Sequence, residues 1–454
     1  MATRREIAAW TLPLVALAAL LASSTPPWPD DWDGLGFVAS IDRFDLDRFA
    51  PHPPGYPVYV ALLRIAGALF RDRVVAANAV AIASGVAAIA LLRSVLAHAK
   101  IARGPWAFAI AAAPLVWRTS SAIGSEAPAL ACAALAMWGL ARRSAVVVGL
   151  AVGIGLGVRL SWAPFLVPML FLVTERRARA WAVATCATAA WLVPFVTIVG
   201  SSHLVALLRA HFAGHAARWG GTALTEPGAG RLALLARDLF VDGIGVDADA
   251  LGIAIGVLVA ALAFVALRTW SNERWRGARA AAILLGPYAL WIVVGQNLRQ
   301  QPRHALPLVV AIAALLVVTV ARASSPRVRA LGAALLVLTA ARTFLDAHAR
   351  RVTPPPGAQL AEWMRDRGDA IVFGGASVRF CESTPLALRA AGADTMGDVV
   401  LGLARRGAVP SRVFATSEVS GASEGDLVAE LCRPPRIDRR APCVRVYDVT
   451  AIAR

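Results

Sequence analysis

Long apolar blocks constrain what this chain can fold into more than any other feature. Apolar residues fill stretches such as 75–97, 180–200, 250–267 and 305–321. A strand in a globular core is about 5–6 residues long, whereas a helix that crosses a bilayer needs about 20 apolar residues. Within lipid, the backbone must satisfy its own hydrogen bonds, which a helix does by itself. The sequence therefore predicts an all-α, multi-pass membrane protein.

The composition supports this class and excludes others. Hydrophobic residues make up 58% of the 454 residues and charged residues only 17%, whereas an average soluble domain is about one quarter charged. A disordered chain, a coiled coil and an ordinary cytosolic enzyme are thereby excluded. The net charge of +17 does not indicate nucleic-acid binding, because the arginines form short clusters between apolar blocks, as topology signals do.

The apolar blocks predict about eleven membrane spans. The first block has two interpretations, a cleaved signal peptide or a retained span, and we favour the span because so many others follow it. The expected spans lie near residues 7–23, 75–97, 105–121, 127–141, 145–158, 162–173, 180–200, 250–267, 280–294, 305–321 and 330–345.

The arginine clusters predict the orientation of these spans. Clusters such as Arg142-Arg143 and Arg176-Arg177 alternate with loops that hold few basic residues, and basic loops face the cytoplasm. We expect the N-terminus inside and the C-terminus outside, with long outer loops at 24–74 and 201–248. This assignment makes Tyr56–Phe70 an interfacial helix rather than a span.

The composition changes after Pro354–Pro356, which predicts two domains, residues 1–350 in the membrane and residues 351–454 outside it. The second has the size of a small soluble α/β domain. Outside the cytoplasm Cys432 and Cys443 can form a disulfide, although two free thiols fit the sequence equally well. The expected elements are a helix at Gln359–Arg367 and strands at Ala370–Phe373, Arg412–Thr416 and Cys443–Val449.

The first outer loop has an unusual composition. It opens with Pro29-Asp30-Asp31-Trp32-Asp33, holds six aspartates within 18 positions, and ends in Pro51-His52-Pro53-Pro54-Gly55-Tyr56-Pro57. Acidic residues are ordinary on the outer side of a membrane protein, and prolines break helices. Those facts do not explain prolines and aromatic rings gathered around a histidine. Irregular backbone near a membrane is tolerated where it lines a cavity, so this loop is a candidate site.

Two other positions place ionisable residues at the expected outer ends of spans. Glu126 begins the fourth span, and a carboxylate beside a membrane is costly enough to indicate a site; pairing with Arg118 is the structural alternative. Arg303 and His304 precede the tenth span, where they suit an anionic headgroup or simply extend to the interface.

Two further patterns favour a structural interpretation. Gly153-Ile-Gly155-Leu-Gly157 resembles a dinucleotide motif but lies inside an apolar span, where small residues let helices approach closely. His211 and His215 are one helical turn apart and could bind a metal ion. Since no third ligand is near them in the sequence, we expect solvated loop histidines.

Taken together, these features resemble the bacterial GT-C glycosyltransferases. The acidic loop followed by His52-Pro53-Pro54-Gly55-Tyr56-Pro57 is similar to protein O-mannosyltransferase-like enzymes and, more distantly, to the lipid A aminoarabinose transferase. The segment around Ser125-Glu126 resembles the second acidic loop of that family. Gly157-Val158-Arg159-Leu160-Ser161-Trp162 and Arg303-His304-Ala305-Leu306-Pro307 resemble later segments. The resemblance covers residues 1–175 and, more weakly, 295–320.

The resemblance implies transfer of a sugar from a polyprenyl-phosphate donor at the outer face of a bacterial inner membrane. Its acceptor is unknown, and a divalent cation is possible. An aspartate of the first loop would be the general base, which matches Asp33 first and Asp31 second; Glu126 matches the second acid. The donor phosphate would contact His52, Arg303 and His304, and the pocket would include Tyr56, Trp32 and Arg159.

Two classes compete with this expectation. A transporter or flippase would carry a lipid-linked or small anionic solute, usually through ionisable or broken-helix sites at mid-membrane. A membrane anchor that displays the C-terminal domain would need no site at all. Ionisable residues at the outer edge and the lack of a detectable internal repeat favour the transferase.

Overall fold

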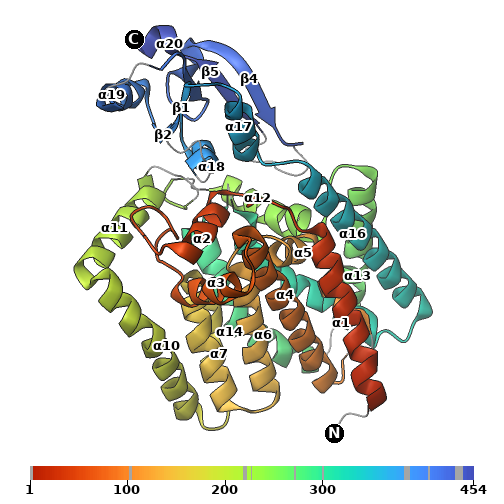
Figure 1. Ribbon diagram of the computed structural model, residues 1–454. Helices are drawn as coiled ribbons and strands as arrows, with labels where there is room; N and C mark the ends of the chain where they lie inside the picture. Colours follow the sequence, from red (N-terminus) through yellow and green to blue (C-terminus); the bar gives the residue numbers. More distant parts are fainter. Residues whose placement is uncertain are drawn as a thin grey trace. The chain divides into compact units, whose positions relative to one another are not determined.

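The computed structural model separates the chain into two compact units (Figure 1). It describes residues 4–101, 105–217, 222–225, 228–269, 272–298, 301–382, 389–406, 410–434 and 443–453. The helical unit comprises Met1–Thr25 and Asp45–Ala347, and the sheet unit comprises Pro26–Phe44 and His348–Arg454. The sequence analysis placed all of 24–74 with the membrane domain, whereas the structure groups Pro26–Phe44 with the C-terminal residues.

The helical unit consists of helices throughout its described residues. The apolar blocks all become helical, because an apolar run can satisfy its backbone only within itself. The elements are α1 (Arg4–Ser24), α3 (Pro57–Leu69), α4 (Arg73–His98), η1 (Pro105–Ile110), α5 (Pro114–Ser120), α6 (Glu126–Ala141), α7 (Ala145–Val158), η2 (Leu160–Trp162), α8 (Ala163–Leu166), α9 (Pro168–Phe171), α10 (Arg177–Val199), α11 (Ser201–Ala217), α12 (Ala229–Arg237), η3 (Asp238–Asp242), α13 (Ala250–Arg268), α14 (Asn272–Gly295), η4 (Pro302–Ala305), α15 (Leu306–Arg322) and most of α16 (Pro326–Val352).

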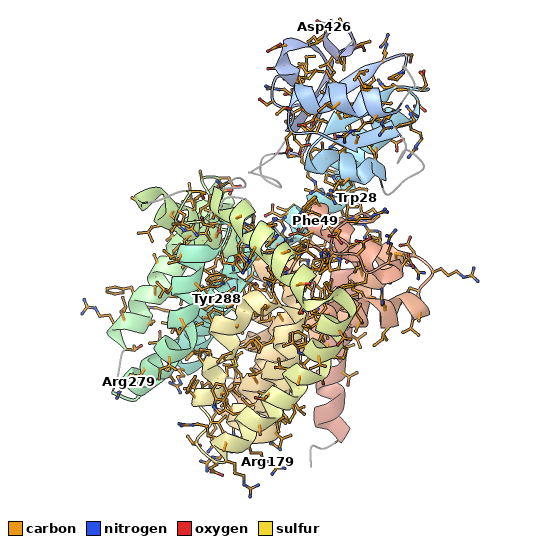
Figure 2. All side chains as sticks on the ribbon, turned by 90° about the vertical axis from the view of Figure 1, so that its left-hand side faces the viewer. Trp28, Phe49, Arg179, Arg279, Tyr288 and Asp426 are labelled. Carbon is orange, nitrogen blue, oxygen red and sulfur yellow. A yellow bond between two sulfur atoms is a disulfide. The ribbon has the colours of Figure 1, made fainter. Side chains whose placement is uncertain are left out.

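The structure confirms the expected class of polytopic membrane protein. Among the described residues, five helical segments are long and apolar enough to cross a bilayer, and they include α4, α10 and α13. The other apolar blocks form shorter helices, and 105–121 is divided between η1 and α5. Figure 2 shows Arg179 and Arg279 toward one end of the helical unit and Phe49 toward the other. This arrangement agrees with basic clusters and outer loops at opposite ends, while the orientation of the termini stays a prediction.

The second long loop is more ordered than the sequence analysis expected. Residues 201–248 contain α11, α12 and η3. His211 and His215 therefore lie on a helix and are half-buried, so the expectation of solvated loop histidines was wrong.

The sheet unit is a three-layer α/β arrangement, as expected. Its sheet has the order β2-β1-β3-β5-β4, in which β1 is parallel to β2 and β3, and β5 is antiparallel to β3 and β4. The elements are α2 (Trp32–Asp42), α17 (Pro356–Arg365), β1 (Ile371–Gly374), η5 (Ala376–Val378), α18 (Arg379–Glu382), β2 (Ala390–Gly392), α19 (Met396–Arg406), β3 (Val413–Thr416), η7 (Ala422–Glu424), β4 (Asp426–Cys432), β5 (Cys443–Asp448) and α20 (Thr450–Ala453).

Side chains along the central strands point alternately to the two faces of the sheet, so each face has its own hydrophobic core. Phe373 and Val413 pack with α19 and α20 on one face, whereas Val372 and Phe414 pack with α17 on the other. The expected helix and three strands are therefore confirmed. The sequence analysis missed β2 and β4, which are a three-residue strand and an exposed edge strand.

Glycines let α7 pack directly on α10, which explains the glycine-rich motif (Figure 1). A Cβ atom on Gly153 would lie 2.6 Å from the carbonyl oxygen of Ala184, and one on Gly149 would lie 2.5 Å from that of Ala180. Neither distance is possible for real atoms, so the two backbones approach this closely only because the positions are glycine. The interpretation of close helix packing is confirmed.

We predict that Gly153→Ala destabilises the helical unit by about 1–3 kcal/mol, because the added methyl must force α7 away from α10. Thermal unfolding in detergent measures this loss. Gly286→Ala on α14 is the matched control, since a Cβ there meets nothing within 4 Å, and alanine is the better helix former. Equal melting temperatures for the two variants would contradict the proposed close contact.

Candidate functional site

A buried ion cluster lies in the helical unit around Glu126. The carboxylate is 2% exposed, and its Oε1 lies 2.9 Å from Nη1 of Arg159 and 2.9 Å from Nε of Arg303. Glu126 is the first residue of α6, where a negative charge interacts favourably with the helix dipole. The sequence analysis gave a pair with Arg118 as the structural alternative. In the structure Glu126 pairs with two other arginines, each of which comes from a different segment.

Hydrogen bonds extend this ion cluster to neighbouring polar groups. Arg159 Nη1 donates to Oγ of Ser125 at 2.7 Å, and its Nη2 lies 3.2 Å from Nδ1 of His304. Because a guanidinium only donates, Nδ1 of His304 is the acceptor. The hydroxyl of Tyr288 donates to the His304 carbonyl at 2.9 Å and thereby holds η4 in place.

Aromatic side chains enclose the ion cluster. Tyr59 in the first turn of α3 is fully buried and lies within electrostatic range of Glu126, Arg159 and Arg303. The ring of Tyr288 packs against Trp162, with centroids 6.1 Å apart, and Figure 2 places Tyr288 within the helical unit. A wall of large rings excludes water and strengthens electrostatic interactions inside it.

This ion cluster brings two guanidinium groups together in a largely buried place. Arg159 is 3% exposed and the Arg303 side chain 14%. Guanidinium groups bind phosphate oxygens through strong, charge-assisted hydrogen bonds. The arrangement therefore suits contact with a phosphate group.

A second group of polar residues surrounds His52. Nε2 of His52 lies 2.8 Å from the hydroxyl of Tyr56, which immediately precedes α3. The His52 ring stacks on His211 of α11 with centroids 6.2 Å apart, and His211 contacts His215 at 4.7 Å. Since Tyr59 belongs to the first turn of the same helix, α3 connects this histidine group to the ion cluster.

The aspartates of the first outer loop lie in the sheet unit. Asp31 caps α2, because its carboxylate accepts from the Gly34 N–H at 2.9 Å. Asp33 follows in the first turn of this helix. The guanidinium of Arg379 lies over the ring of Trp32, with its carbon 4.2 Å from the ring centroid. Asp31 is thus engaged in capping.

The structure therefore gathers the expected site residues into three groups. Glu126, Arg159, Arg303 and His304 form the ion cluster, and His52 and Tyr56 form the second group. The third group is Asp31-Trp32-Asp33 in the sheet unit.

The sequence analysis missed three residues that belong to the ion cluster or enclose it: Ser125, Tyr59 and Tyr288. The rarity of tyrosine in this chain could have pointed to two of them. The chain has only four tyrosines, and the three in the helical unit, at 56, 59 and 288, all lie in these two groups.

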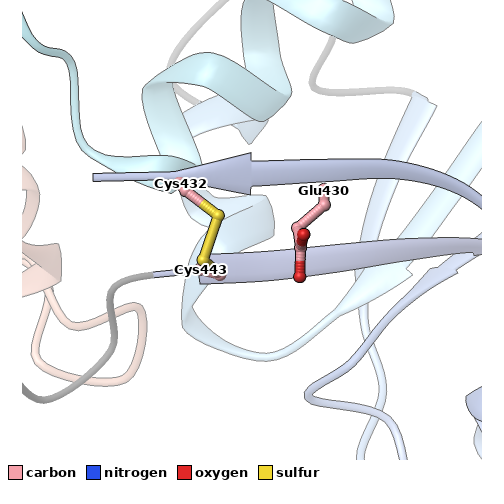
Figure 3. A group of neighbouring side chains, drawn as sticks. All are labelled: Glu430, Cys432 and Cys443. Atoms are coloured by element: carbon pink, nitrogen blue, oxygen red, sulfur yellow. A yellow bond between two sulfur atoms is a disulfide. The ribbon is translucent and has the colours of Figure 1, made fainter. Parts of the chain in front are cut away.

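The described residues offer no metal site of the expected kind. The nitrogen atoms of His52, His211 and His215 do not all lie within 4.8 Å of one another. Glu430, Cys432 and Cys443 do converge, but Figure 3 shows that the two cysteines form a disulfide, so their sulfurs are not thiolate ligands. Of the two possibilities for these cysteines, the structure adopts the bridge.

Comparison with solved structures identifies the fold. The chain superposes on ArnT from Cupriavidus metallidurans bound to undecaprenyl phosphate with a TM-score of 0.53 and 13% identity, covering 97% of this chain and 98% of that one. The apo structure of the same protein gives a TM-score of 0.52 and 13% identity, with 98% and 99% coverage. No protein-family model and no curated protein matches the chain. The chain therefore has the fold of ArnT, so the fold implied by the sequence resemblance is confirmed.

We predict that Glu126→Gln destabilises the helical unit by about 3–5 kcal/mol, because it removes the charge of a buried carboxylate that pairs with two largely buried guanidiniums. The midpoint of thermal unfolding in detergent reports this effect. The matched control is Glu175→Gln, which removes a carboxylate that is 62% exposed and pairs with Arg143; such surface pairs contribute at most about 1 kcal/mol. If Glu126→Gln unfolds no earlier than the control, the ion cluster is not held by this carboxylate.

Proposed function

We propose that the protein is a membrane glycosyltransferase that moves a sugar from a polyprenyl-phosphate donor to an acceptor of the cell envelope. The observation that carries the proposal is the ion cluster, which brings the guanidinium groups of Arg159 and Arg303 together in a largely buried place. It occurs in a chain whose fold is that of ArnT, which has been crystallised with undecaprenyl phosphate. A lipid-linked phosphate is the anion that a membrane-embedded cationic site would meet.

The chemistry assigns the cations to the leaving group. When the bond between the sugar and the phosphate breaks, the phosphate gains negative charge, and preorganised cations stabilise that charge. We assign Arg303, His304 and His52 to the donor phosphate. Glu126 Oε1 is already paired with Arg159 and Arg303, so we assign it to the orientation of these guanidiniums rather than to proton transfer.

The acceptor side requires a base. An acceptor hydroxyl attacks the anomeric carbon while the bond to the phosphate oxygen breaks, and its proton passes to a carboxylate within hydrogen-bond reach. We assign this role to Asp33, with Asp31 as the alternative. Attack from the side opposite the phosphate inverts the anomeric centre. Tyr56, Trp32 and Arg159 would line the sugar pocket.

The reaction would take place at the outer face of a bacterial inner membrane, with the N-terminus cytoplasmic and the sheet unit outside. The disulfide between Cys432 and Cys443 supports this placement, because such bonds persist in oxidising compartments. The sugar and its acceptor, whether lipid, glycan or protein, are open. Mass spectrometry of envelope glycans and polyprenyl-linked sugars in a deletion strain would identify both.

We predict that Asp33→Asn abolishes sugar transfer, since the amide cannot accept the proton, while the protein still folds. The assay uses purified protein in detergent with a polyprenyl-phosphate sugar and an envelope extract. Asp42→Asn is the matched control, because Asp42 is exposed and lies at the other end of the same eleven-residue helix. We expect this variant to retain full activity. Normal transfer by Asp33→Asn would refute the assigned base. If the wild type shows no transferase activity and Asp33→Asn loses the translocation of lipid-linked sugar in liposomes, the results would favour a flippase.

We predict that His52→Ala raises the KM for the donor about tenfold, the cost of losing one charge-assisted hydrogen bond to phosphate. His52→Lys, which keeps a cation at the position, retains a KM near that of the wild type. His98→Ala in the last turn of α4 controls for the loss of an imidazole elsewhere. An unchanged donor KM in His52→Ala would remove this residue from the phosphate site.

A further inference from the structure

Two arginines of the C-terminal residues hold the start of the first outer loop. Asp30 is largely buried, with its side chain 8% exposed. Its Oδ1 accepts from Nη2 of Arg433 at 3.2 Å, and its Oδ2 forms an ion pair with Nη2 of Arg350. Arg350 lies near the end of α16 and Arg433 directly follows β4. Asp30 is therefore bonded to two separate elements of the sheet unit.

The backbone around Arg433 is itself firmly held. The preceding residue, Cys432, is in the disulfide with Cys443, and its carbonyl accepts from Nε2 of Gln359 at 2.8 Å. Arg433 Nε donates to the carbonyl of Thr353 at 2.9 Å. Its side chain is 2% exposed, so this guanidinium has one position available to it. Arg433 consequently presents a fixed donor to Asp30.

A second contact holds the loop two residues further on. Arg379, the first residue of α18, lies over the ring of Trp32 at 4.2 Å. Stacking of a guanidinium on a Trp face is a favourable cation–π contact. Asp30 and Trp32 are thus both held by the sheet unit, and Asp31 between them caps α2. The backbone that carries Asp33 begins directly after these three contacts.

The burial of these ion pairs argues against a purely stabilising role for this arrangement. Asp30 pairs with two arginines whose side chains are 5% and 2% exposed. A buried ion pair is often no more stabilising than apolar residues of similar volume. Ion pairs do, however, require one geometry, whereas an apolar contact tolerates several. Directional contacts of this kind suit a segment whose exact position matters.

We infer that Arg433, Arg350 and Arg379 are positioning residues for the general base, and that the C-terminal part of the sheet unit orients the first outer loop for catalysis. This inference rests on the proposed function and assigns a role to a region that the sequence resemblance left without one. The three arginines act through Asp30 and Trp32 and do not touch the reacting atoms. Displacement of a reacting group by about 1 Å can cost about a hundredfold in rate.

A double-mutant cycle on the full-length protein in detergent tests the inference. We expect Arg433→Gln and Asp30→Asn each to lower kcat about tenfold or more, with the donor KM unchanged within about twofold. We expect the kcat of the double variant to be no lower than that of the more impaired single variant, because both substitutions remove the same contact. Arg445→Gln is the matched control, since it removes an exposed arginine that pairs with Glu430 in the same sheet unit, and it retains full kcat.

Hydrogen exchange provides a readout that does not depend on activity. In Arg433→Gln we expect faster exchange within residues 30–36 and unchanged exchange in β1 and β3. Unchanged exchange in 30–36 together with normal kcat would overturn the inference. Faster exchange throughout the sheet unit would also overturn it, because Arg433 would then be a structural residue only.

Two further outcomes are separable. If Arg433→Gln fails to fold, Arg379→Gln decides the question, since it removes the contact with Trp32 and should lower kcat in the same way. If the wild type transfers no sugar but exchange in 30–36 still depends on Arg433, the proposed function fails while the positioning of the loop stands.

Discussion

A carboxylate removed from water needs positive partners, and the way Glu126 obtains them organises the helical unit. Its partners come from the residue that follows α7 and from η4, so a single side chain connects three segments that are far apart in the sequence. Ser125, His304 and Tyr288 extend the same connection through hydrogen bonds. Because the ion pairs of Glu126 form only when its partner segments lie beside it, they favour one arrangement of these segments. The two guanidinium groups gathered there make the place suitable for an anion.

The general architecture could be predicted from the sequence because it depends on local physics. Apolar blocks must become helices in lipid, and the short apolar run of Val413–Thr416 predicts a strand with two buried faces. The partners of buried charges could not be predicted in this way. Glu126 and Arg303 were recognised from their positions at the ends of spans, and Arg159 from the sequence resemblance, but nothing local in the sequence shows that they meet. Their pairing depends on how helices pack, which is a property of the whole fold.

The division into units illustrates the same limit. A pattern-based boundary follows changes in composition along the chain, and the prolines at 354–356 mark one such change. Residues 26–44 follow the first span in the sequence, yet they share a unit with residues 348–454. Their association depends on Asp30 meeting Arg350 and Arg433, and on Trp32 meeting Arg379. Short strands are also hard to predict, since β2 has only three residues and no room for a periodic pattern.

The contact between Asp30 and Arg433 joins residues that are 403 positions apart, and this has a consequence for biosynthesis. A ribosome adds Asp30 to the chain 403 residues before Arg433. A nascent chain that has not reached Arg433, or one shortened by a stop codon before it, therefore carries the acidic loop without this partner. The contacts of the loop are complete only after Arg433 has been made.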